Sequence, residues 1–451
     1  MAIISQARLS DVNELVRFDA EYYKPEFLSN KRLLKNCQKV VRFGEIIELI
    51  TNGATPYMSD YTKGEIRFLT AENIGELAIY DEPKKYITRS GHQMLKRSAL
   101  KEGDLLITIK GRVGNCAIVE ELKEETNINQ DIARIVLKRG IDPYFVAVFF
   151  ECKYGQFQVK QRASGMINPF IGLNNLVEFK IPIFAKDFQN RIRKLIIESN
   201  NKRKKSESKY KKAESLLLKE LGITKLNLLS KKGYESKFSL VKETIRFDAE
   251  YYQPKYEQII KILNNSGFEI RRLKEVVTIS NKKIDPLKTL TKRFRYIPIA
   301  KIDISGDING YDEFFGWQAP SRARMLVKKG DVLVSSLSGS LDKIALVPQE
   351  LDNSLATTGT FVIRSNLFYS EFLFLLFRTP IIKLQLEQKT SGAIMSAVPR
   401  STFGDLLIPV IPKTKQERIV SFIKEFFDLR KEAKQLVEQA KREVEKKIES
   451  N

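Results

Sequence analysis

The sequence predicts an α+β protein with an internal pseudo-two-fold repeat: two tandem mixed α/β domains of short strands plus helices, each followed by a long helix. Three observations predict this fold. The motif RFDAEYY occurs at 17–23 and again at 246–252. Later segments recur at a constant offset of 227 residues. Each half ends in a long segment with apolar residues at helical spacing.

The repeat spans about half of the chain per copy. KEGDLLIT (101–108) returns as KKGDVLVS (328–335), and SGMINPFIGLNNLVEFKIPI (164–183) returns as SGAIMSAVPRSTFGDLLIPV (391–410). The RFDAEYY copies lie 229 residues apart, so insertions and deletions in between leave a net difference of two residues. A unit of this size indicates a duplicated domain rather than a solenoid of short repeats.

Each half has the same expected order of elements. RFDAEYY and a proline precede a short helical stretch. Short apolar runs between Gly, Asn, Asp and Pro residues then predict strands and turns, as in IRFLTAENI (66–74) and DLLITIKGRVGNCAIV (104–119). One amphipathic helix is expected next, at 142–161 in the first half and 370–389 in the second. An SG-containing loop and an IPI or IPV strand follow.

A long helix is expected to close each half, at about 186–220 and 413–449. The second has apolar residues at alternating spacings of four and three, which is typical of a coiled-coil seam. The middle of the first is polar (200–209), which indicates a solvated face, a loosely packed segment, or a face for a protein or DNA. The two helices are expected to pack antiparallel as a spacer. The predicted domains are 1–185, 186–222, 223–412 and 413–451.

The composition suits a polyanionic partner. The chain has 77 Lys and Arg against 55 Asp and Glu, a net charge of +22. Three cysteines without CxxC spacing and the single His92 argue against a zinc site and against a histidine-based catalytic triad. No signal peptide is apparent, and the longest apolar runs are too short to span a bilayer. A cytoplasmic protein that does not contact a membrane is therefore expected.

The two halves differ mainly at turns. Three pairs of segments change while the flanking framework is kept: NGATP (52–56) and NKKIDP (281–286), KGRVGN (110–115) and LSGSLD (337–342), INPFIGL (167–173) and IMSAVPR (394–400). Loops on a rigid scaffold commonly carry recognition. A retained core with changed tips is what two readers of different targets would have.

Candidate DNA-binding residues lie in and beside these turns. Lys110 and Arg112 follow a predicted strand directly, and such side chains bind phosphate or guanine. Asn115 and Asn168 have the amide that pairs with adenine. The remaining candidates are polar or basic: Thr55, Arg322, Arg324, Ser336, Ser338 and Arg400. For each residue alone, a solvated surface side chain is the alternative. RFDAEYY itself is interpreted as a packing or partner-docking motif.

These motifs resemble the specificity subunits of Type I restriction–modification systems, over essentially the full length. The resemblance rests on the doubled RFDAEYY-P, the run at 52–74, KEGDLLIT and KKGDVLVS, the SG…IPI and SG…IPV ends, and the paired QNRI (189–192) and QERI (416–419). The second half has no N-G-x-T-P counterpart.

The resemblance implies two target-recognition domains that read the halves of a split, asymmetric site in double-stranded DNA. It also implies two modification subunits that methylate adenine with S-adenosylmethionine, and restriction subunits that use ATP and Mg. No catalytic, cofactor or metal residues are then expected in this chain. It has no [ND]PP[YF] tetrapeptide and no GxxxxGK[ST] loop.

Three alternatives stay open at this point. A self-contained DNA enzyme would methylate or cleave DNA without partners. A coiled-coil scaffold that binds only proteins would leave no footprint on DNA. The chain could also be the specificity part of a related restriction system.

Overall fold

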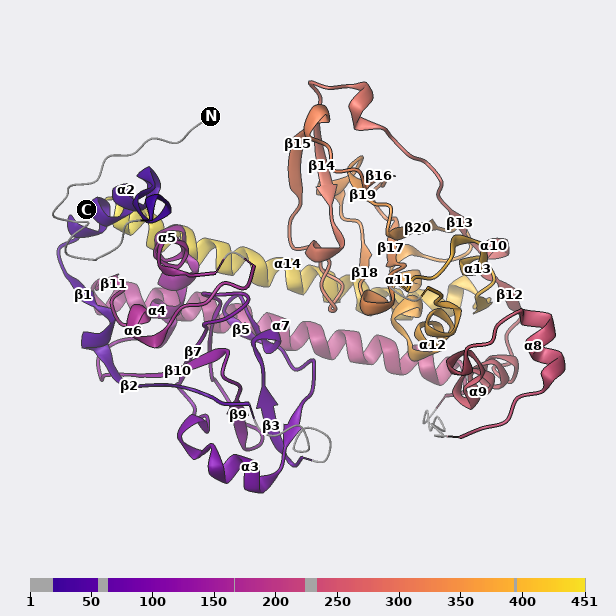
Figure 1. Cartoon of the computed structure of the whole chain (residues 1–451), viewed down its shortest axis with the longest axis horizontal. Coiled ribbons are helices and arrows are strands. Elements are labelled where there is room, and N and C mark those ends of the chain that lie inside the picture. Colours follow the sequence, from indigo (N-terminus) through magenta and orange to yellow (C-terminus); the bar gives the residue numbers. More distant parts are fainter. Residues whose placement is uncertain (1–18, 56–63, 166, 224–232, 393–395, 451) are drawn as a thin grey trace. The chain divides into compact units, whose positions relative to one another are not determined.

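The computed structural model describes residues 19–55, 64–165, 167–223, 233–392 and 396–450. The chain divides into two compact units (Figure 1). Unit 1 comprises the chain up to Lys204 together with Arg430–Asn451, and unit 2 comprises Lys205–Leu429. Each unit therefore contains a part of both long helices.

A four-stranded antiparallel sheet forms the centre of each unit. In unit 1 its order is β2-β10-β7-β8, with β2 at Ile47–Asn52, β10 at Ile132–Leu137, β7 at Leu105–Thr108 and β8 at Cys116–Ile118. In unit 2 it is β13-β20-β17-β18, with β13 at Thr278–Ile279, β20 at Thr360–Arg364, β17 at Val332–Ser335 and β18 at Ile344–Leu346. Every residue of β7 and β17 is buried, as expected of an apolar run covered on both faces.

A second sheet differs in size between the units. Unit 1 has β6 (Tyr86–Ile87), β3 (Ile66–Leu69) and β9 (Thr126–Ile128), with β3 and β9 parallel. Unit 2 has β15 (Asp312–Phe315), β14 (Arg293–Ile297), β19 (Leu355–Thr357) and β16 (Ala323–Leu326), with β14 and β19 parallel. Unit 1 also has a small pair, β4 (Ile74–Gly75) and β5 (Ala78–Ile79). Strands predicted within 66–74 and 104–119 are thus confirmed.

Short strand pairs join the start of each repeat to its end. β1 (Val40–Arg42) pairs with β11 (Lys180–Pro182), and β12 (Ile270–Arg272) pairs with β21 (Leu407–Pro409). The IPI and IPV strands are therefore confirmed. The helical stretch after RFDAEYY is also confirmed, because α2 (Pro25–Lys35) and α9 (Pro254–Asn264) both begin with the proline, which is favourable at the first helical position.

The prediction of one amphipathic helix in the middle of each half is wrong. The segments form two helices each: α4 (Pro143–Glu151) and α5 (Lys153–Arg162), then α11 (Ser370–Arg378) and α12 (Pro380–Lys389). The breaks fall at Cys152 and Thr379, whose backbones are extended, and in unit 2 a proline follows the break. Because residues 144–150 of α4 are all buried, this helix belongs to the core on every side.

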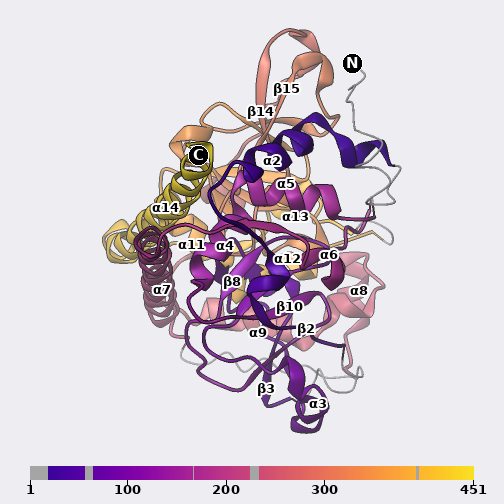
Figure 2. The ribbon, with the colours of Figure 1, turned by 90° about the vertical axis from the view of Figure 1, so that its left-hand side faces the viewer.

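The long helices are α7 (Lys186–Glu220) and α14 (Lys413–Glu449), with the predicted bounds. They pair antiparallel within each unit. In unit 1, Arg191 lies 2.8 Å from Glu443, and the Ser199 hydroxyl donates to the Ala433 carbonyl at 2.9 Å (Figure 2). In unit 2, Lys415 lies 2.7 Å from Glu220. The apolar seam residues of α14 from Ile419 to Val444 are buried.

The solvated-face interpretation of the polar middle of α7 is wrong for its central lysines and arginine. Lys202 pairs with Glu432 at 2.6 Å and Lys204 with Glu120 at 3.2 Å. Arg203 donates to the Glu76 carbonyl at 3.0 Å. In unit 2, Lys209 pairs with Glu425. These contacts fix α7 within each unit.

Shorter helices complete the described part of the chain: α3 (Arg89–Met94), α6 (Leu173–Leu176), α8 (Phe238–Thr244), α10 (Leu273–Val276) and α13 (Arg400–Phe403). None of the helices in the described ranges has the length and apolar character needed to cross a membrane.

Candidate nucleic-acid interface

Two loops of unit 1 are joined into one surface, here called loop pair 1: residues 109–115 and the described residues of 164–171. The amide of Ile171 donates to the Ile109 carbonyl at 2.9 Å, and the amide of Gly111 donates to the Pro169 carbonyl at 3.0 Å. Ser164 and Phe170 exchange backbone hydrogen bonds at 2.9 and 2.8 Å. The turn after β7 and the loop after α5 therefore form a continuous rim.

Unit 2 builds the same arrangement, here called loop pair 2, from residues 336–342 and the described residues of 391–400. Val398 donates to the Ser336 carbonyl at 2.8 Å, and Ser338 donates to the Ser396 carbonyl at 2.9 Å. The bridge between Lys110 and Phe170 recurs between Leu337 and Ala397. These positions lie 227 residues apart, so the sequence offset carries over to the contacts.

Loop pair 1 presents three of the five candidates predicted in unit 1 to solvent. Lys110, Arg112 and Asn168 are exposed, and the two cations have no ion pair with any residue in the described ranges. Asn115 is half-buried, and its amide group donates to the Ile74 carbonyl at 3.4 Å. Thr55 is exposed, and its hydroxyl donates to the side chain of Gln130. Asn115 and Thr55 are thus already bonded within the unit.

In loop pair 2 the candidates are more occupied. Ser336 is buried, and its hydroxyl donates to the Gly359 carbonyl at 2.9 Å. Arg400 donates to the Ser280 carbonyl at 2.5 Å, and burial lowers the pKa of its guanidinium. Ser338 is exposed. Loop pair 2 therefore offers small polar groups where loop pair 1 offers free cations.

Arg322 and Arg324 lie outside loop pair 2, at the start of β16. Arg322 is exposed, with no ion pair in the described part of the chain. Arg324 is half-buried and lies 3.4 Å from the carboxylate of Asp285. The structure thus gathers only some of the unit 2 candidates into one surface.

The turn NGATP depends on its glycine. A Cβ atom on Gly53 would lie 1.9 Å from the Ile128 carbonyl oxygen, so only glycine allows this approach to β9. Unit 2 has Lys282 and Lys283 in the corresponding segment. The different sequence of the second half therefore brings charge to a position that is closely packed in the first.

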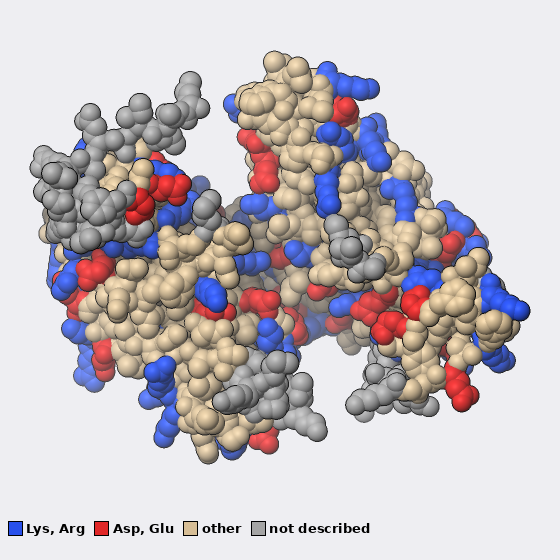
Figure 3. Space-filling view, in the orientation of Figure 1, with Lys and Arg blue, Asp and Glu red and all other residues tan. Residues whose placement is uncertain are grey.

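The sequence comparison of turns missed a basic segment of unit 2. Residues 280–302 contain seven Lys and Arg residues and one acidic residue, whereas 52–74 contain two and three. A count of charge along the inserts would have found it. Figure 3 shows Lys and Arg side chains over the part of unit 2 that carries β14 and β15.

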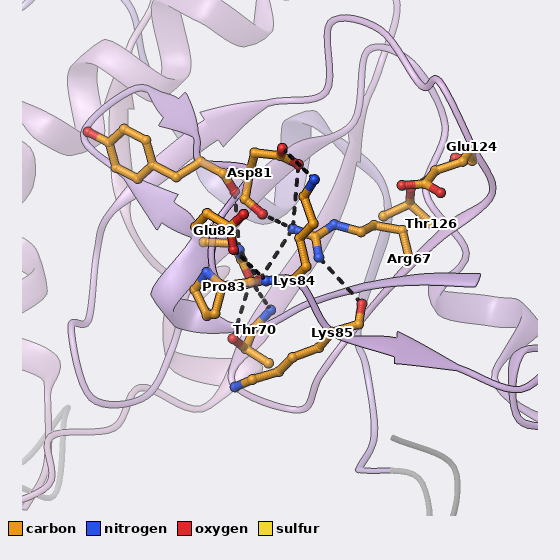
Figure 4. A network of polar contacts seen from close by, with 11 residues as sticks. Arg67, Thr70, Asp81, Glu82, Pro83, Lys84, Lys85, Glu124 and Thr126 are labelled. Carbon is orange, nitrogen blue, oxygen red and sulfur yellow. Dashed lines mark hydrogen bonds and ion pairs between the residues drawn. The ribbon is translucent and has the colours of Figure 1, made fainter. Parts of the chain in front are cut away.

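The one arginine of the unit 1 segment serves the framework. Arg67 on β3 is buried, and its guanidinium donates to the carbonyls of Lys85 at 3.4 Å and Pro83 at 3.3 Å (Figure 4). It also contacts the Asp81 carbonyl and lies 3.9 Å from the Asp81 carboxylate. This network fixes the loop 81–85 and leaves Arg67 unavailable to a ligand.

RFDAEYY packs against the helix that follows the break in each repeat. Gln161 of α5 donates to the Tyr22 carbonyl at 2.9 Å, and Gln388 of α12 donates to the Tyr251 carbonyl at 3.1 Å. In unit 2, Arg246 holds Asp248 through two hydrogen bonds of 2.6 and 2.7 Å. The packing interpretation of the motif is confirmed for these residues, while Arg17 and Phe18 of the first copy lie outside the described residues.

Within the described ranges, no group of three or more His, Cys, Asp and Glu side chains is arranged to hold a metal ion. The two loop pairs and the basic segment of unit 2 are therefore the surfaces that carry exposed polar and cationic groups for a ligand.

Comparison with known families gives two matches along the chain. The family model described as the Type I restriction modification DNA specificity domain matches residues 36–198 and again 265–439. No curated protein sequence matches the chain.

Solved structures give matches over most of the chain. The S subunit of a Type I restriction–modification system from M. genitalium is 13% identical, with a TM-score of 0.41 over 92% of this chain and 96% of that one. The HsdS subunit from Thermoanaerobacter tengcongensis is 15% identical, with a TM-score of 0.31 over 91% and 96%.

Proposed function

The chain belongs to the family of Type I restriction modification DNA specificity domains, with two copies of the domain, and is a DNA-recognition specificity subunit; we propose that each unit reads one half of a split, asymmetric site. The observation that carries the proposal is the pair of loop surfaces. Both are built at the same positions of the repeat and both are held by the same backbone hydrogen bonds. Their exposed side chains differ, which is what two half-sites of different sequence require.

The loop pairs are proposed to enter the major groove, where all four base pairs can be distinguished. In unit 1, Arg112 is suited to a guanine edge and Lys110 to a phosphate, since both are exposed and without an ion pair in the described residues. In unit 2, Ser338 is the exposed donor of loop pair 2. Ser336, Asn115 and Arg400 act as positioning residues, because their polar groups already bond to the framework.

The paired helices are proposed to act as the spacer that sets the distance between the two half-sites. Each helix contributes residues to both units, and ion pairs join the two helices in each unit. Because an α-helix rises about 1.5 Å per residue, inserting or deleting helical residues would change the spacing without changing the bases read.

Catalysis is proposed to lie in partner subunits in the cytoplasm. Two modification subunits would methylate adenine with S-adenosylmethionine, and restriction subunits would use ATP and Mg to translocate and cleave. The chain would supply only the sequence specificity of the complex. A self-contained enzyme is the alternative, and it would transfer methyl groups or cleave DNA as the purified chain.

Methylation mapping tests the proposal. Genomic DNA is compared between cells that carry this chain with a modification subunit and cells that lack only this chain. The expected result is a methyl mark at one split motif that depends on this chain, which also gives both half-sites. A mark that persists without the chain would contradict the proposal. No mark in either strain, with an active modification subunit, would favour a scaffold that binds only proteins.

A further inference from the structure

We propose that unit 2 grips the DNA backbone beside its half-site through a basic hollow formed by the segment before β14 and by β16. This inference rests on the proposed function and locates a phosphate-binding surface that the turn comparison did not include. The hollow has a volume of about 620 Å³. Lys283, Lys288, Lys292 and Arg324 line it, with Asp285 as the only acidic residue of its lining.

The charge of the hollow is largely unneutralised. Arg324 lies 3.4 Å from Asp285, so this one carboxylate is already engaged. The three lysines are exposed and make no ion pair with any residue that the structure describes. Three free ammonium groups around one concave surface favour a ligand with several negative charges, because each additional anionic group finds its own cation.

The framework beneath the lysines is well fixed. The backbone of Lys283 is bridged to Met325 of β16, and the Leu326 amide donates to the Lys282 carbonyl at 3.0 Å. The Lys292 ammonium lies 5.4 Å from the centre of the buried Phe294 ring. Asp285 caps the short helical turn at 286–288 by accepting from the Leu287 amide at 3.2 Å. The cations therefore project from an ordered surface, which lowers the entropy lost on binding.

An apolar edge adjoins the hollow. The side chains of Trp317 and Leu290 are 62% and 53% exposed, and the Trp317 amide donates to the Leu290 carbonyl at 3.2 Å. Their close approach requires Gly316, since a Cβ atom there would lie 2.2 Å from the Thr289 carbonyl oxygen. Cations beside exposed apolar groups match a nucleic-acid strand, in which phosphates alternate with sugars and bases.

Double-stranded DNA is the ligand that these observations favour. The basic hollow lies in a DNA-specificity domain, and the homologous segment of unit 1 holds its arginine in the framework instead. Phosphate contacts position a protein on the duplex without reading its sequence. The hollow is therefore expected to strengthen binding without defining the recognised bases.

The test is DNA binding by the complex of this chain with its modification subunits, as a function of salt, on DNA that carries the mapped motif. The variant replaces Lys283, Lys288 and Lys292 by Gln. The slope of log affinity against log salt is expected to fall by about 2 to 3, and affinity near 0.15 M salt to fall about 10-fold or more. The methylated motif should not change. The control replaces Lys211, Lys212 and Lys219, three exposed lysines of α7 in unit 2, by Gln, and should keep the wild-type slope.

The outcomes separate the inference from the proposed function. A wild-type slope for the Lys283, Lys288 and Lys292 variant, with normal specific binding by the wild type, would overturn the inference alone. Loss of binding to the modification subunits in place of DNA would overturn it in favour of an acidic protein surface. Failure of the wild-type complex to bind the split site would overturn the proposed function. Lys288→Gln alone, expected to reduce the slope by about 1, covers the case in which the triple variant does not fold.

Discussion

The two units have the same framework but carry their free cations in different places. Unit 1 exposes Lys110 and Arg112 on loop pair 1 and buries Arg67. Unit 2 has small polar groups on loop pair 2 and exposes its lysines between β13 and β14. The repeat offset therefore transfers the fold and its hydrogen bonds from one unit to the other, but it does not transfer the charged surface.

The shared framework includes a buried ion pair before the central strand. In unit 1, Arg134 lies 2.5 Å from Asp104, and their side chains are 7% and 4% exposed. In unit 2, Arg364 lies 2.8 Å from Asp331, with side chains 40% and 3% exposed. In both, the aspartate also accepts from the backbone amide three residues earlier, at 2.7 and 2.8 Å. The contact is the same, but the arginine is closed off from water only in unit 1.

The largest predicted effect follows from this difference. Asp104→Asn leaves the guanidinium of Arg134 buried without its counter-charge and is expected to destabilise unit 1 by about 3–5 kcal/mol. Asp331→Asn should cost unit 2 only about 1–3 kcal/mol, because water can solvate Arg364. Hydrogen exchange measured by mass spectrometry assigns each loss to its unit. Equal losses would show that exposure of the arginine does not decide the effect.

The second prediction concerns the reading surface. Lys110→Ala combined with Arg112→Ala should reduce discrimination at one half-site by about 2–4 kcal/mol in total, since each good base contact contributes about 1–3 kcal/mol. The other half-site should be read as before. Binding to DNA with either half-site randomised measures both effects. Equal loss at both half-sites would mean that the two units do not read separately.

Arg322→Ala combined with Ser338→Ala is the matched variant in unit 2. It removes one exposed cation and one exposed hydroxyl, and should affect only the half-site that the first variant leaves intact. If both variants affect the same half-site, the assignment of one half-site to each unit is wrong.

Two buried glutamines give the third prediction. Gln189 accepts from the Asp142 amide at 3.1 Å and donates to the Phe184 carbonyl at 2.8 Å. Gln416 makes the corresponding bonds to Tyr369 and Ile411 at 3.0 and 2.8 Å. Gln189→Ala and Gln416→Ala should each cost about 1–3 kcal/mol, because both leave a backbone donor and acceptor unpaired. Denaturant unfolding compares the two variants, and a large difference would show that the repeat offset overstates the equivalence.

Much of the fold could be predicted because the duplication writes each pattern twice. The bounds of α7 and α14, the strands after the SG loops and the helices after RFDAEYY all follow from paired segments. The glutamine of the Q-x-R-I pair is explained by its two hydrogen bonds, a role that the spacing alone did not reveal. The helix breaks at Cys152 and Thr379 were missed because apolar periodicity continues through a short extended residue.

The candidate site could be predicted only in part. Positions of turns follow from strand ends, so Lys110, Arg112 and Ser338 were placed correctly on loop surfaces. Whether a polar side chain in a turn is free depends on what packs behind it, as the bonds of Asn115, Ser336 and Arg400 illustrate. Such contacts join segments distant in sequence, and no local pattern encodes them.

One framework position has opposite charge in the two units. The last residue of α4 is Glu151, and the residue 227 positions later, at the end of α11, is Arg378. Glu151 accepts from the Cys116 amide at 2.7 Å, with Glu76, Lys441 and Arg203 as its charged neighbours. Arg378 donates to the Tyr210 hydroxyl at 3.0 Å. Only unit 1 therefore has an acidic group at this junction.

The smallest predicted effect is a pH dependence confined to unit 1. Burial raises the pKa of Glu151 from 4.5 to about 8, so the folded unit keeps a proton that the unfolded chain has lost. The stabilisation linked to this proton is complete below about pH 4.5 and is lost as pH rises towards about 8, by at most about 1.4 kcal/mol per pH unit. Glu151→Gln should remove this slope from unit 1, and Arg378→Gln in unit 2 should leave it unchanged. Hydrogen exchange at several pH values measures it, and an unchanged slope in Glu151→Gln would mean that Glu151 is ionised in the folded unit.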